Sequence, residues 1–335
     1  MSRYSRQELF APIGPEGQAR IRAIRVLLVG CGALGTHLAE FCVRAGVGSL
    51  TIVDRDFVEP SNLQRQSLFT EQDANEALPK AVAAERHLRK LNSAVAVRGV
   101  VEDFTFRNAE KLAADADLIL DGTDNFEARF LLNDVAVKTR KPWIYAACVS
   151  AQANCMPVLP GRTACLRCLL EEQPAAGGET CDTVGVIMPA VLQAVAWASV
   201  VALKIMTGHE ASLLCKHYNV DLWTGERRIL DASTPRADCP CCGRHEYPWL
   251  EGKRASRAST LCGRDSVQIA AQGDFNYEAA RQNIRKAARV ITENAYLLRA
   301  EYEGLTLTLY RTGRALVHGT SDVGKAKAVY AMAVG

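Results

Sequence analysis

A glycine-rich turn that follows an apolar run constrains the fold of this chain more than any other feature. Residues 25–29 form a short apolar run suited to a strand buried on both faces. A Gly-x-Gly-x-x-Gly turn over residues 30–35 follows, and apolar side chains then recur at helical spacing over residues 33–45. Another apolar run covers residues 49–54. This strand–helix–strand unit needs a crossover connection, which makes its two strands parallel.

The alternation of strands and helices continues as far as residue 150. In that part we expect helices over 80–91, 107–115 and 126–139, and strands over 94–101, 117–121 and 143–149. This pattern predicts an α/β fold, a Rossmann-like doubly wound domain with a mostly parallel sheet. After residue 150 the chain changes to cysteine-bearing loops, a long apolar helix and a strand near residues 214–220.

The long apolar segment, residues 184–206, raises the question of a membrane span. It contains Pro189, Gln193 and Lys204, whereas a span needs about 20 consecutive apolar residues. We therefore interpret it as a buried core or interface helix and expect no membrane partner.

A polar stretch over residues 251–261 is interpreted as a linker to a small C-terminal α+β domain over residues 262–335. In that domain we expect a strand over 266–270, a helix over 277–291, a hairpin over 296–318 that turns at 311–313, and a helix over 322–332. The domain has no catalytic cysteine loop, since its one cysteine, Cys262, lies at its boundary.

Charge and cysteine content narrow the class of protein. The net charge is +3, with Lys and Arg spread along the chain, so composition gives no case for a nucleic-acid partner. The N-terminal residues lack the apolar region of a signal peptide. Twelve cysteines without such a signal indicate a reducing compartment. We expect a cytoplasmic protein.

The glycine turn and Asp54 together indicate an adenine nucleotide. Such a turn lets the backbone approach phosphates and points helix N–H groups at them. Asp54 ends the next strand, 24 residues after Gly30, where a carboxylate can bind ribose hydroxyls. By themselves these features favour NAD over ATP. The structural alternative is a nucleotide-free domain that needs its glycines only for close packing.

Charged residues downstream favour a triphosphate. Arg65 and Lys80 would neutralise the charge that gathers on phosphoryl oxygens, and Asp124 could hold magnesium. Taken singly, Arg65 and Lys80 are better interpreted as solvated surface charges. Taken singly, Asp124 is better interpreted as an N-cap of the helix that begins at Phe126.

In their order along the chain, these motifs resemble the ubiquitin-activating-enzyme-like superfamily, and its ThiF/MoeB branch in particular. The motifs are the glycine turn, Asp54-x-Asp56, Ser-Asn-Leu-Gln-Arg-Gln over 61–66, Pro-Lys over 79–80 and Asp-Gly-Thr-Asp-Asn over 121–125. The resemblance covers residues 3–245, and the motif over 61–66 is its most specific part. Ala33 is a mild departure, because a further glycine is common there.

The resemblance implies ATP-dependent adenylation of a small ubiquitin-like sulfur-carrier protein that ends in Gly-Gly. Both a ThiS-like carrier (thiamine) and a MoaD-like carrier (molybdopterin) remain open. It also implies a homodimer in which Arg6 reaches the other subunit's triphosphate, with a cysteine desulfurase as a further partner. Arg6, Arg65, Lys80 and Asp124 would act by position and charge, with no general base. The implied ATP-site residues are Gly30, Gly32, Ala33, Gly35, Asp54, Asp56, Asn62, Arg65, Gln66, Lys80, Asp124 and Asn125.

Two Cys-x-x-Cys pairs predict a structural zinc site. Cys165 and Cys168 form one pair, and Cys239 and Cys242 form the other. Four thiolates match the tetrahedral preference of Zn²⁺, and the ThiF/MoeB branch has the same pairs. Buried free thiols or a redox pair are the alternatives. Cys241 lies between the second pair and is ambiguous.

Cys181 lies in a glycine-rich loop before the long apolar helix. A thiolate near a helix N-terminus is a competent nucleophile, and the resemblance places a reactive cysteine here. The remaining cysteines are interpreted as small core hydrophobes. They are Cys31, Cys42, Cys148, Cys155, Cys215 and Cys262.

Two other functions remain as alternatives. An NAD-dependent oxidoreductase would need an acid or base at its hydride site, and the six histidines form no such pattern. A catalytically silent relative that only binds a carrier would not need its phosphate-binding charges. The C-terminal domain could serve carrier docking or dimer packing.

Overall fold

The computed structural model describes residues 3–172, 181–254, 260–261, 266–269 and 275–334. The chain divides into two compact units. The larger comprises residues 1–74 and 79–255, and the smaller comprises residues 75–78 and 256–335. Each unit has its own sheet and is described by itself.

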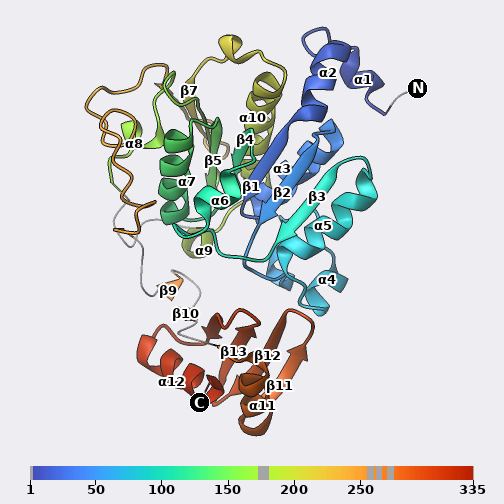
Figure 1. Cartoon of the computed structure of the whole chain (residues 1–335), viewed down its shortest axis with the longest axis vertical. Helices are drawn as coiled ribbons and strands as arrows, with labels where there is room; N and C mark the ends of the chain where they lie inside the picture. Colours follow the sequence, from blue (N-terminus) through green and yellow to red (C-terminus); the bar gives the residue numbers. More distant parts are fainter. Residues whose placement is uncertain (1–2, 173–180, 255–259, 262–265, 270–274, 335) are drawn as a thin grey trace. The chain divides into compact units, whose positions relative to one another are not determined.

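The larger unit is built on an eight-stranded sheet in the order β3-β2-β1-β4-β5-β6-β7-β8 (Figure 1). The strands from β3 to β5 pair in parallel, and the strands from β5 onward pair antiparallel. The chain leaves β1 toward β2 and returns to its other side as β4, which is the strand-order reversal of doubly wound folds. The strands are β1 Arg25–Val29, β2 Ser49–Val53, β3 Ala96–Val100, β4 Leu118–Asp121, β5 Trp143–Val149, β6 Gln152–Val158, β7 Lys216–Asp221 and β8 Arg227–Asp231.

Helices cover this sheet. Helix α3 contacts both α5 and α10, whereas α6 contacts α7. Buried side chains of α6 and α7 form one apolar cluster with Trp143 and the strands beneath them. The helices of this unit are α1 Ser5–Glu8, α2 Gly14–Ala23, α3 Ala33–Ala45, α4 Glu71–Asn75, α5 Lys80–Leu91, α6 Ala109–Ala113, α7 Phe126–Thr139, α8 Leu166–Leu169, α9 Cys181–Val184 and α10 Met188–Met206, with the 3-10 turns η1 Pro60–Asn62 and η2 Glu210–Ser212.

The α/β prediction is confirmed, and α3, α5, α7 and β5 have the predicted bounds. Strands β6 and β8 were not expected. Strand β6 alternates polar and apolar residues only over 152–155, and Met156, Pro157 and Val158 then break the alternation that marks a half-buried strand. Ser150, with φ of 54°, turns the chain so that β6 pairs antiparallel to β5. This turn is what ends the parallel sheet.

Helix α10 is long and apolar enough, by length and composition, to cross a membrane. In this unit it packs against β5, β6 and α3 (Figure 1), with Ala194, Ala198 and Ala202 fully buried. Its place agrees with the predicted core or interface helix.

The smaller unit contains a six-stranded sheet in the order β11-β12-β13-β14-β10-β9. Its apolar core includes residues from the sheet and from both helices. The elements are β9 Thr260–Leu261, β10 Ser266–Ile269, α11 Tyr277–Ala287, β11 Arg289–Glu293, β12 Leu297–Tyr302, β13 Leu305–Tyr310, β14 Ala315–His318 and α12 Val323–Val334. The predicted α+β character is confirmed.

Three boundaries in this unit were predicted wrongly. The helix expected over 277–291 ends at Ala287, because the β-branched run that follows it forms β11. The hairpin expected over 296–318 has a second turn at Glu303 and Gly304, both with positive φ, so it is a three-stranded meander. The last two residues of the expected linker belong to β9.

Candidate nucleotide site and cysteine cluster

Three glycines let two loops approach each other at the ends of β1 and β4. A Cβ on Gly35 would lie 2.1 Å from the carbonyl oxygen of Gly30, and a Cβ on Gly122 would lie 2.4 Å from the same atom. Gly30 itself has a φ of +88°, which favours glycine. These three glycines therefore allow close backbone packing, which is the role that the nucleotide-free alternative gave to the glycines of the turn.

Gly32 is different. A Cβ there would meet no atom closer than the side-chain nitrogen of Gln66, at 3.9 Å. Packing does not require a glycine at this position, so its missing side chain leaves room above the turn. Gly32 also stands at the N-cap of α3 and offers no side chain to its first N–H groups. An open helix N-terminus of this kind suits a phosphate. Ala33 begins the helix without distortion.

Asp54 ties the glycine turn to the end of β2. One carboxylate oxygen accepts a hydrogen bond from Cys31 N at 2.6 Å, and the other accepts one from Asp56 N at 2.7 Å. Burial raises the pKa of Asp54, and the ammonium of Lys80 and these two N–H groups oppose that rise. Each oxygen keeps a lone pair that could accept a ribose hydroxyl.

Lys80 is not the solvated surface charge that its sequence allowed. Only 5% of the residue is exposed, and it begins helix α5. Its backbone N donates to Asp56 O at 2.8 Å, and its Nζ lies 3.8 Å from Asp56 Oδ2. The ammonium is therefore held beside the acidic pair at the end of β2.

The segment over residues 59–66 is built around Asn62, which is 2% exposed. The Asn62 side-chain oxygen accepts from Glu59 N at 3.1 Å, and Arg65 Nη1 donates to Ser61 O at 2.9 Å. Gln66 is 3% exposed, and its Oε1 has no hydrogen-bond partner among the described residues. A buried unpaired oxygen of this kind fits a donor supplied by a ligand.

Asp124 follows β4, whose last residue Asp121 is in register with Val29 of β1. The N-cap interpretation of Asp124 is wrong, because Asn125 caps α7 by accepting from Ala128 N at 2.8 Å. Asp124 is exposed, and its Oδ1 lies 3.3 Å from Asn125 Nδ2. An exposed carboxylate beside the glycine turn suits a magnesium ion.

Arg55 is a residue that the sequence reasoning missed. Its Nη1 donates to Asp103 Oδ2 at 2.7 Å, and its Nε lies 3.8 Å from Asp56 Oδ1. Burial lowers the pKa of Arg55, but the neighbouring carboxylates outweigh it and the pKa is raised. Its position between Asp54 and Asp56 was the sequence feature that could have identified Arg55 as a site residue. A second missed residue is Arg129, which pairs with Asp121 inside the same edge of the sheet.

The four predicted zinc ligands lie together. Their sulfur atoms all lie within 4.8 Å of one another, with Cys165 to Cys239 at 3.6 Å and Cys168 to Cys242 at 3.4 Å. Four sulfurs at about 2.3 Å from a tetrahedral zinc would be about 3.8 Å apart, so the set fits Zn²⁺. Cys241 does not belong to it, because its sulfur accepts from Asn133 Nδ2 on helix α7 at 3.2 Å.

The ThiF family matches residues 4–241 of this chain. The chain belongs to the ThiF family. It is 47% identical over 331 residues to the sulfur carrier protein ThiS adenylyltransferase of Bacillus subtilis, with 98% of each chain covered. It is 36% identical over 252 residues to the sulfur carrier protein adenylyltransferase of Thermus thermophilus, covering 72% of this chain and 91% of that one. The resemblance drawn from the motifs is confirmed.

The fold of this ThiF-family chain also matches solved structures. E. coli MccB with MccA-N7isoAsn has a TM-score of 0.63 and 23% identity, over 72% of this chain and 74% of that one. E. coli MccB with ATP has a TM-score of 0.62 and 23% identity, over 72% of this chain and 75% of that one. At this level of identity the likeness concerns the fold alone.

For two predicted residues of this ThiF-family chain, the structure describes no contact with the glycine turn. Arg6 is exposed on α1, and no hydrogen bond or ion pair joins it to the glycine turn among the described residues. Cys181 begins α9, and its side chain lies outside the described residues. Of the cysteines expected in the core, Cys31, Cys42 and Cys155 are buried, Cys148 and Cys215 are half-buried, and Cys262 is outside the described residues.

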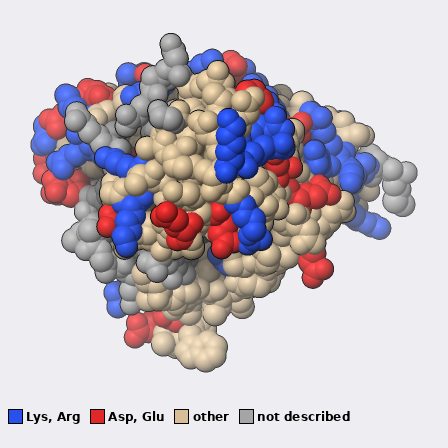
Figure 2. Space-filling model, turned by 90° about the horizontal axis from the view of Figure 1, so that it is seen from below, with Lys and Arg blue, Asp and Glu red and all other residues tan. Residues whose placement is uncertain are grey.

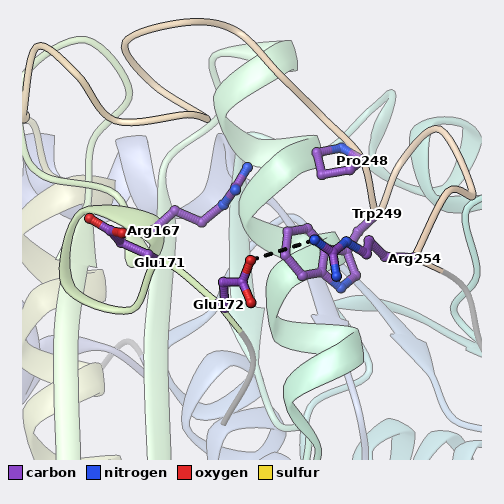
Figure 3. A pocket seen from close by; sticks show the side chains of 6 residues that line it. All are labelled: Arg167, Glu171, Glu172, Pro248, Trp249 and Arg254. Atoms are coloured by element: carbon purple, nitrogen blue, oxygen red, sulfur yellow. Dashed lines mark ion pairs between the residues drawn. The ribbon is translucent and has the colours of Figure 1, made fainter. Parts of the chain in front are cut away.

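A separate pocket of about 210 Å³ contains none of the predicted nucleotide-site residues (Figure 3). Its lining carries both charges: Arg254 pairs with Glu172 at 3.6 Å, and the Arg167 guanidinium lies 5.0 Å from the ring centre of Trp249. On the face shown in Figure 2, Lys and Arg likewise alternate with Asp and Glu instead of forming a uniformly basic surface.

Proposed function

We propose that this chain is a nucleotidyltransferase that uses ATP to adenylate the C-terminal glycine carboxylate of a small ubiquitin-like sulfur-carrier protein. The observation that carries the proposal is the 47% identity to a ThiS adenylyltransferase over 98% of both chains. The opening above Gly32, the uncapped start of α3 and the buried ammonium of Lys80 support ATP as the nucleotide.

A ThiS-like carrier, and hence thiamine biosynthesis, is the form of the proposal that the relatives favour. The Bacillus relative is named for ThiS and spans this chain from end to end. By contrast, the Sus scrofa adenylyltransferase and sulfurtransferase MOCS3 matches 78% of this chain over 58% of its own length. A MoaD-like carrier and molybdopterin biosynthesis remain the alternative within the same chemistry.

The reaction needs positioning more than proton transfer. A carboxylate oxygen of the carrier's terminal glycine attacks the α-phosphorus of ATP, the bond to the bridging oxygen breaks, and pyrophosphate leaves with the electron pair. The carboxylate is already ionised at neutral pH. Lys80 and Arg65 would hold the phosphates by charge, while Asp54 and Asp56 would hold the ribose side. Magnesium bound at Asp124 would neutralise charge on the phosphate oxygens.

The proposal includes a homodimer with shared sites. Helix α10 exposes an apolar stripe, with Met188 36%, Leu192 43% and Val200 54% exposed. An exposed apolar surface of this kind is typical of a protein interface. Arg6, exposed on α1, would complete the partner subunit's site. Mixing inactive Arg6→Ala and Asp124→Ala chains should restore part of the activity, because a mixed dimer has one intact site. No recovery after verified subunit exchange would contradict shared sites.

We propose structural zinc in the four-cysteine cluster, because its thiolates suit a closed tetrahedral site.

Cys181 is proposed as the nucleophile of a later sulfur-transfer step, with a cysteine desulfurase as a further partner. The cytoplasm is the proposed location, since the cluster needs reduced thiols. By domain, residues 1–250 would carry adenylation, and a linker that begins at residue 251 and ends before β9 would lead to the C-terminal domain, which would serve carrier docking or dimer packing.

Carrier-dependent ATP–pyrophosphate exchange tests this function. Purified protein with ATP, magnesium and a ThiS-like carrier should incorporate labelled pyrophosphate into ATP, and a carrier without its final Gly-Gly should not. A MoaD-like carrier assayed in parallel identifies the pathway. Binding of NAD in place of ATP, or binding of the carrier without exchange, would contradict the proposal.

A further inference from the structure

A buried ion pair lies directly beneath the Asp124 loop. Asp121, fully buried, ends β4, and Arg129, 6% exposed, lies one turn into α7. Arg129 Nε is 3.4 Å from Asp121 Oδ2. The guanidinium lies 5.3 Å from the ring centre of Phe126 and 5.6 Å from that of Tyr145. Aromatic rings and a carboxylate therefore hold this side chain in one place.

Both members of the pair also hold Thr123, the residue before Asp124. Asp121 Oδ1 accepts from Thr123 N at 2.9 Å and from Thr123 Oγ1 at 2.7 Å. Arg129 Nη2 donates to Thr123 O at 2.8 Å. That carbonyl belongs to the peptide group that joins Thr123 to Asp124. Thr123 is thus held by its N–H, its hydroxyl and its carbonyl, and the backbone that leads into Asp124 is fixed.

The residues on either side of Asp124 are fixed as well. Gly122 packs against the Gly30 carbonyl, and Asn125 is committed to capping α7. Asp124 and Asn125 are both exposed, but the Asn125 side-chain oxygen accepts from Ala128 N, so Asp124 presents the carboxylate of this loop. A rigid loop that presents one exposed carboxylate is what a site needs in order to hold a ligand in a set direction.

Stability by itself does not account for the pair. Removing two charges from water is costly, and apolar residues of similar volume often serve a core equally well. Burial alone would lower the pKa of Arg129, but Asp121 together with Tyr145, Asp124 and Cys148 outweighs this effect and the pKa is raised, so Arg129 stays a cation. The Arg129 guanidinium is permanently charged and contacts the Thr123 carbonyl and the Asp121 carboxylate together, so it is suited to positioning the loop between them.

We propose that Arg129 and Asp121 are positioning residues that direct the Asp124 carboxylate toward the metal of the nucleotide site. The inference rests on the proposed function, in which Asp124 holds magnesium. Losing the Arg129 fork should release the Thr123–Asp124 peptide and weaken metal use. Loss of such supporting contacts elsewhere lowers metal affinity or activity about 10- to 100-fold.

The test is the magnesium dependence of ATP–pyrophosphate exchange in Arg129→Lys, which keeps the charge but loses the fork. The free magnesium concentration for half-maximal exchange should rise about tenfold or more, with the KM for the carrier unchanged, and calorimetric titration should show the same rise for magnesium-dependent ATP binding without turnover. Arg167→Lys is the matched control. Arg167 is 7% exposed and also stacks on an aromatic ring, but it lines the separate pocket. Its magnesium midpoint should not move.

A second variant keeps the test decisive if Arg129→Lys does not fold. Thr123→Val removes the hydroxyl bonded to Asp121 and should shift the magnesium midpoint in the same direction by a smaller factor. An unchanged midpoint in a folded variant overturns the positioning role. Asp124→Asn separates the two proposals: if it retains normal exchange, the proposed function of Asp124 is wrong. If Asp124→Asn is inactive while Arg129→Lys and Thr123→Val behave like wild type, only the present inference fails.

Discussion

The Gly30 carbonyl oxygen lies against Gly35 so closely that a Cβ on Gly35 would stand 2.1 Å from it. Gly35→Ala should therefore force the turn apart and destabilise the protein by about 1–3 kcal/mol, as overpacked cores do. At Gly32, three residues earlier, an added Cβ would make only an ordinary van der Waals contact, 3.9 Å from the side-chain nitrogen of Gln66. Gly32→Ala should fold normally and bind ATP more weakly, because its methyl group would occupy the phosphate space.

Thermal unfolding and ATP titration on both glycine variants check this prediction. Stability loss in Gly35→Ala with wild-type stability in Gly32→Ala is the expected outcome. Unchanged ATP affinity in Gly32→Ala would mean that the nucleotide does not approach the turn at this residue.

Removing the Asp124 carboxylate should nearly abolish carrier-dependent ATP–pyrophosphate exchange and leave the fold intact. The side chain is exposed and does not cap α7, so its loss costs little packing. We expect Asp124→Ala to lower kcat by about 100-fold or more, as the loss of a well-placed charge does in other active sites. Asp115→Ala is the control, because that side chain is 95% exposed and lies outside the site. Near-normal exchange in Asp124→Ala would contradict the role.

Cys181→Ala should spare adenylation and impair only later sulfur transfer. The attack on ATP uses the carrier's own carboxylate, so a thiol has no part in it. The exchange assay and a sulfur-transfer assay with a cysteine desulfurase, run on the same preparation, separate the two steps. Loss of exchange itself would argue against a purely downstream role for Cys181.

Cys165→Ser should lose the bound zinc and unfold at lower temperature, because Cys165 supplies one of four sulfurs that join two distant segments. The matched control is Cys241→Ser. Cys241 is equally buried, but its sulfur faces Asn133 and does not join the cluster. Metal analysis of both variants should find about one zinc per chain only in the control. Zinc loss in Cys241→Ser alone would reassign the ligands.

Asp73, near the start of α4, should make the stability of the protein depend on pH. Its carboxylate accepts hydrogen bonds from Thr70 N and Oγ1, both at 2.8 Å, and from His87. Burial alone would raise the pKa of Asp73, but these hydrogen bonds outweigh it and the pKa is lowered. Because the folded-state pKa is below the unfolded-state pKa of an aspartate, ionised Asp73 stabilises the fold at any pH above the unfolded-state pKa. This contribution is lost as the pH falls through the folded-state pKa.

Asp73→Asn should therefore reduce the free energy of unfolding by about 1–2 kcal/mol at neutral pH. The difference from wild type should shrink below about pH 4, where the unfolded-state carboxylate begins to protonate. Urea denaturation at several pH values measures it, with Asp115→Asn as the exposed control. A difference that does not change with pH would mean that the charge of Asp73 contributes nothing.

Local patterns in the sequence were enough to predict much of the fold. The helices over 33–45, 80–91 and 126–139 have the bounds that periodicity and flanking residues indicated. Helical hydrogen bonds join residues four apart, so the information that sets them is near at hand in the chain. The helix expected to reach residue 291 was too long, because the β-branched run that follows Ala287 forms β11 and pairs with β12.

Some site features were also readable in advance, since motif order identified the family and the paired cysteines indicated a metal cluster. Only the tertiary structure separated Gly35, which packs against backbone, from Gly32, which does not. It likewise set Cys242 in the cluster and turned Cys241 toward α7. The buried pair of Arg129 and Asp121 could not be predicted from the sequence either. The cysteine and ion-pair distinctions depend on atoms that folding brings close from another element, whereas Gly35 depends on the path of the backbone back toward Gly30, and no spacing along the chain records these distances.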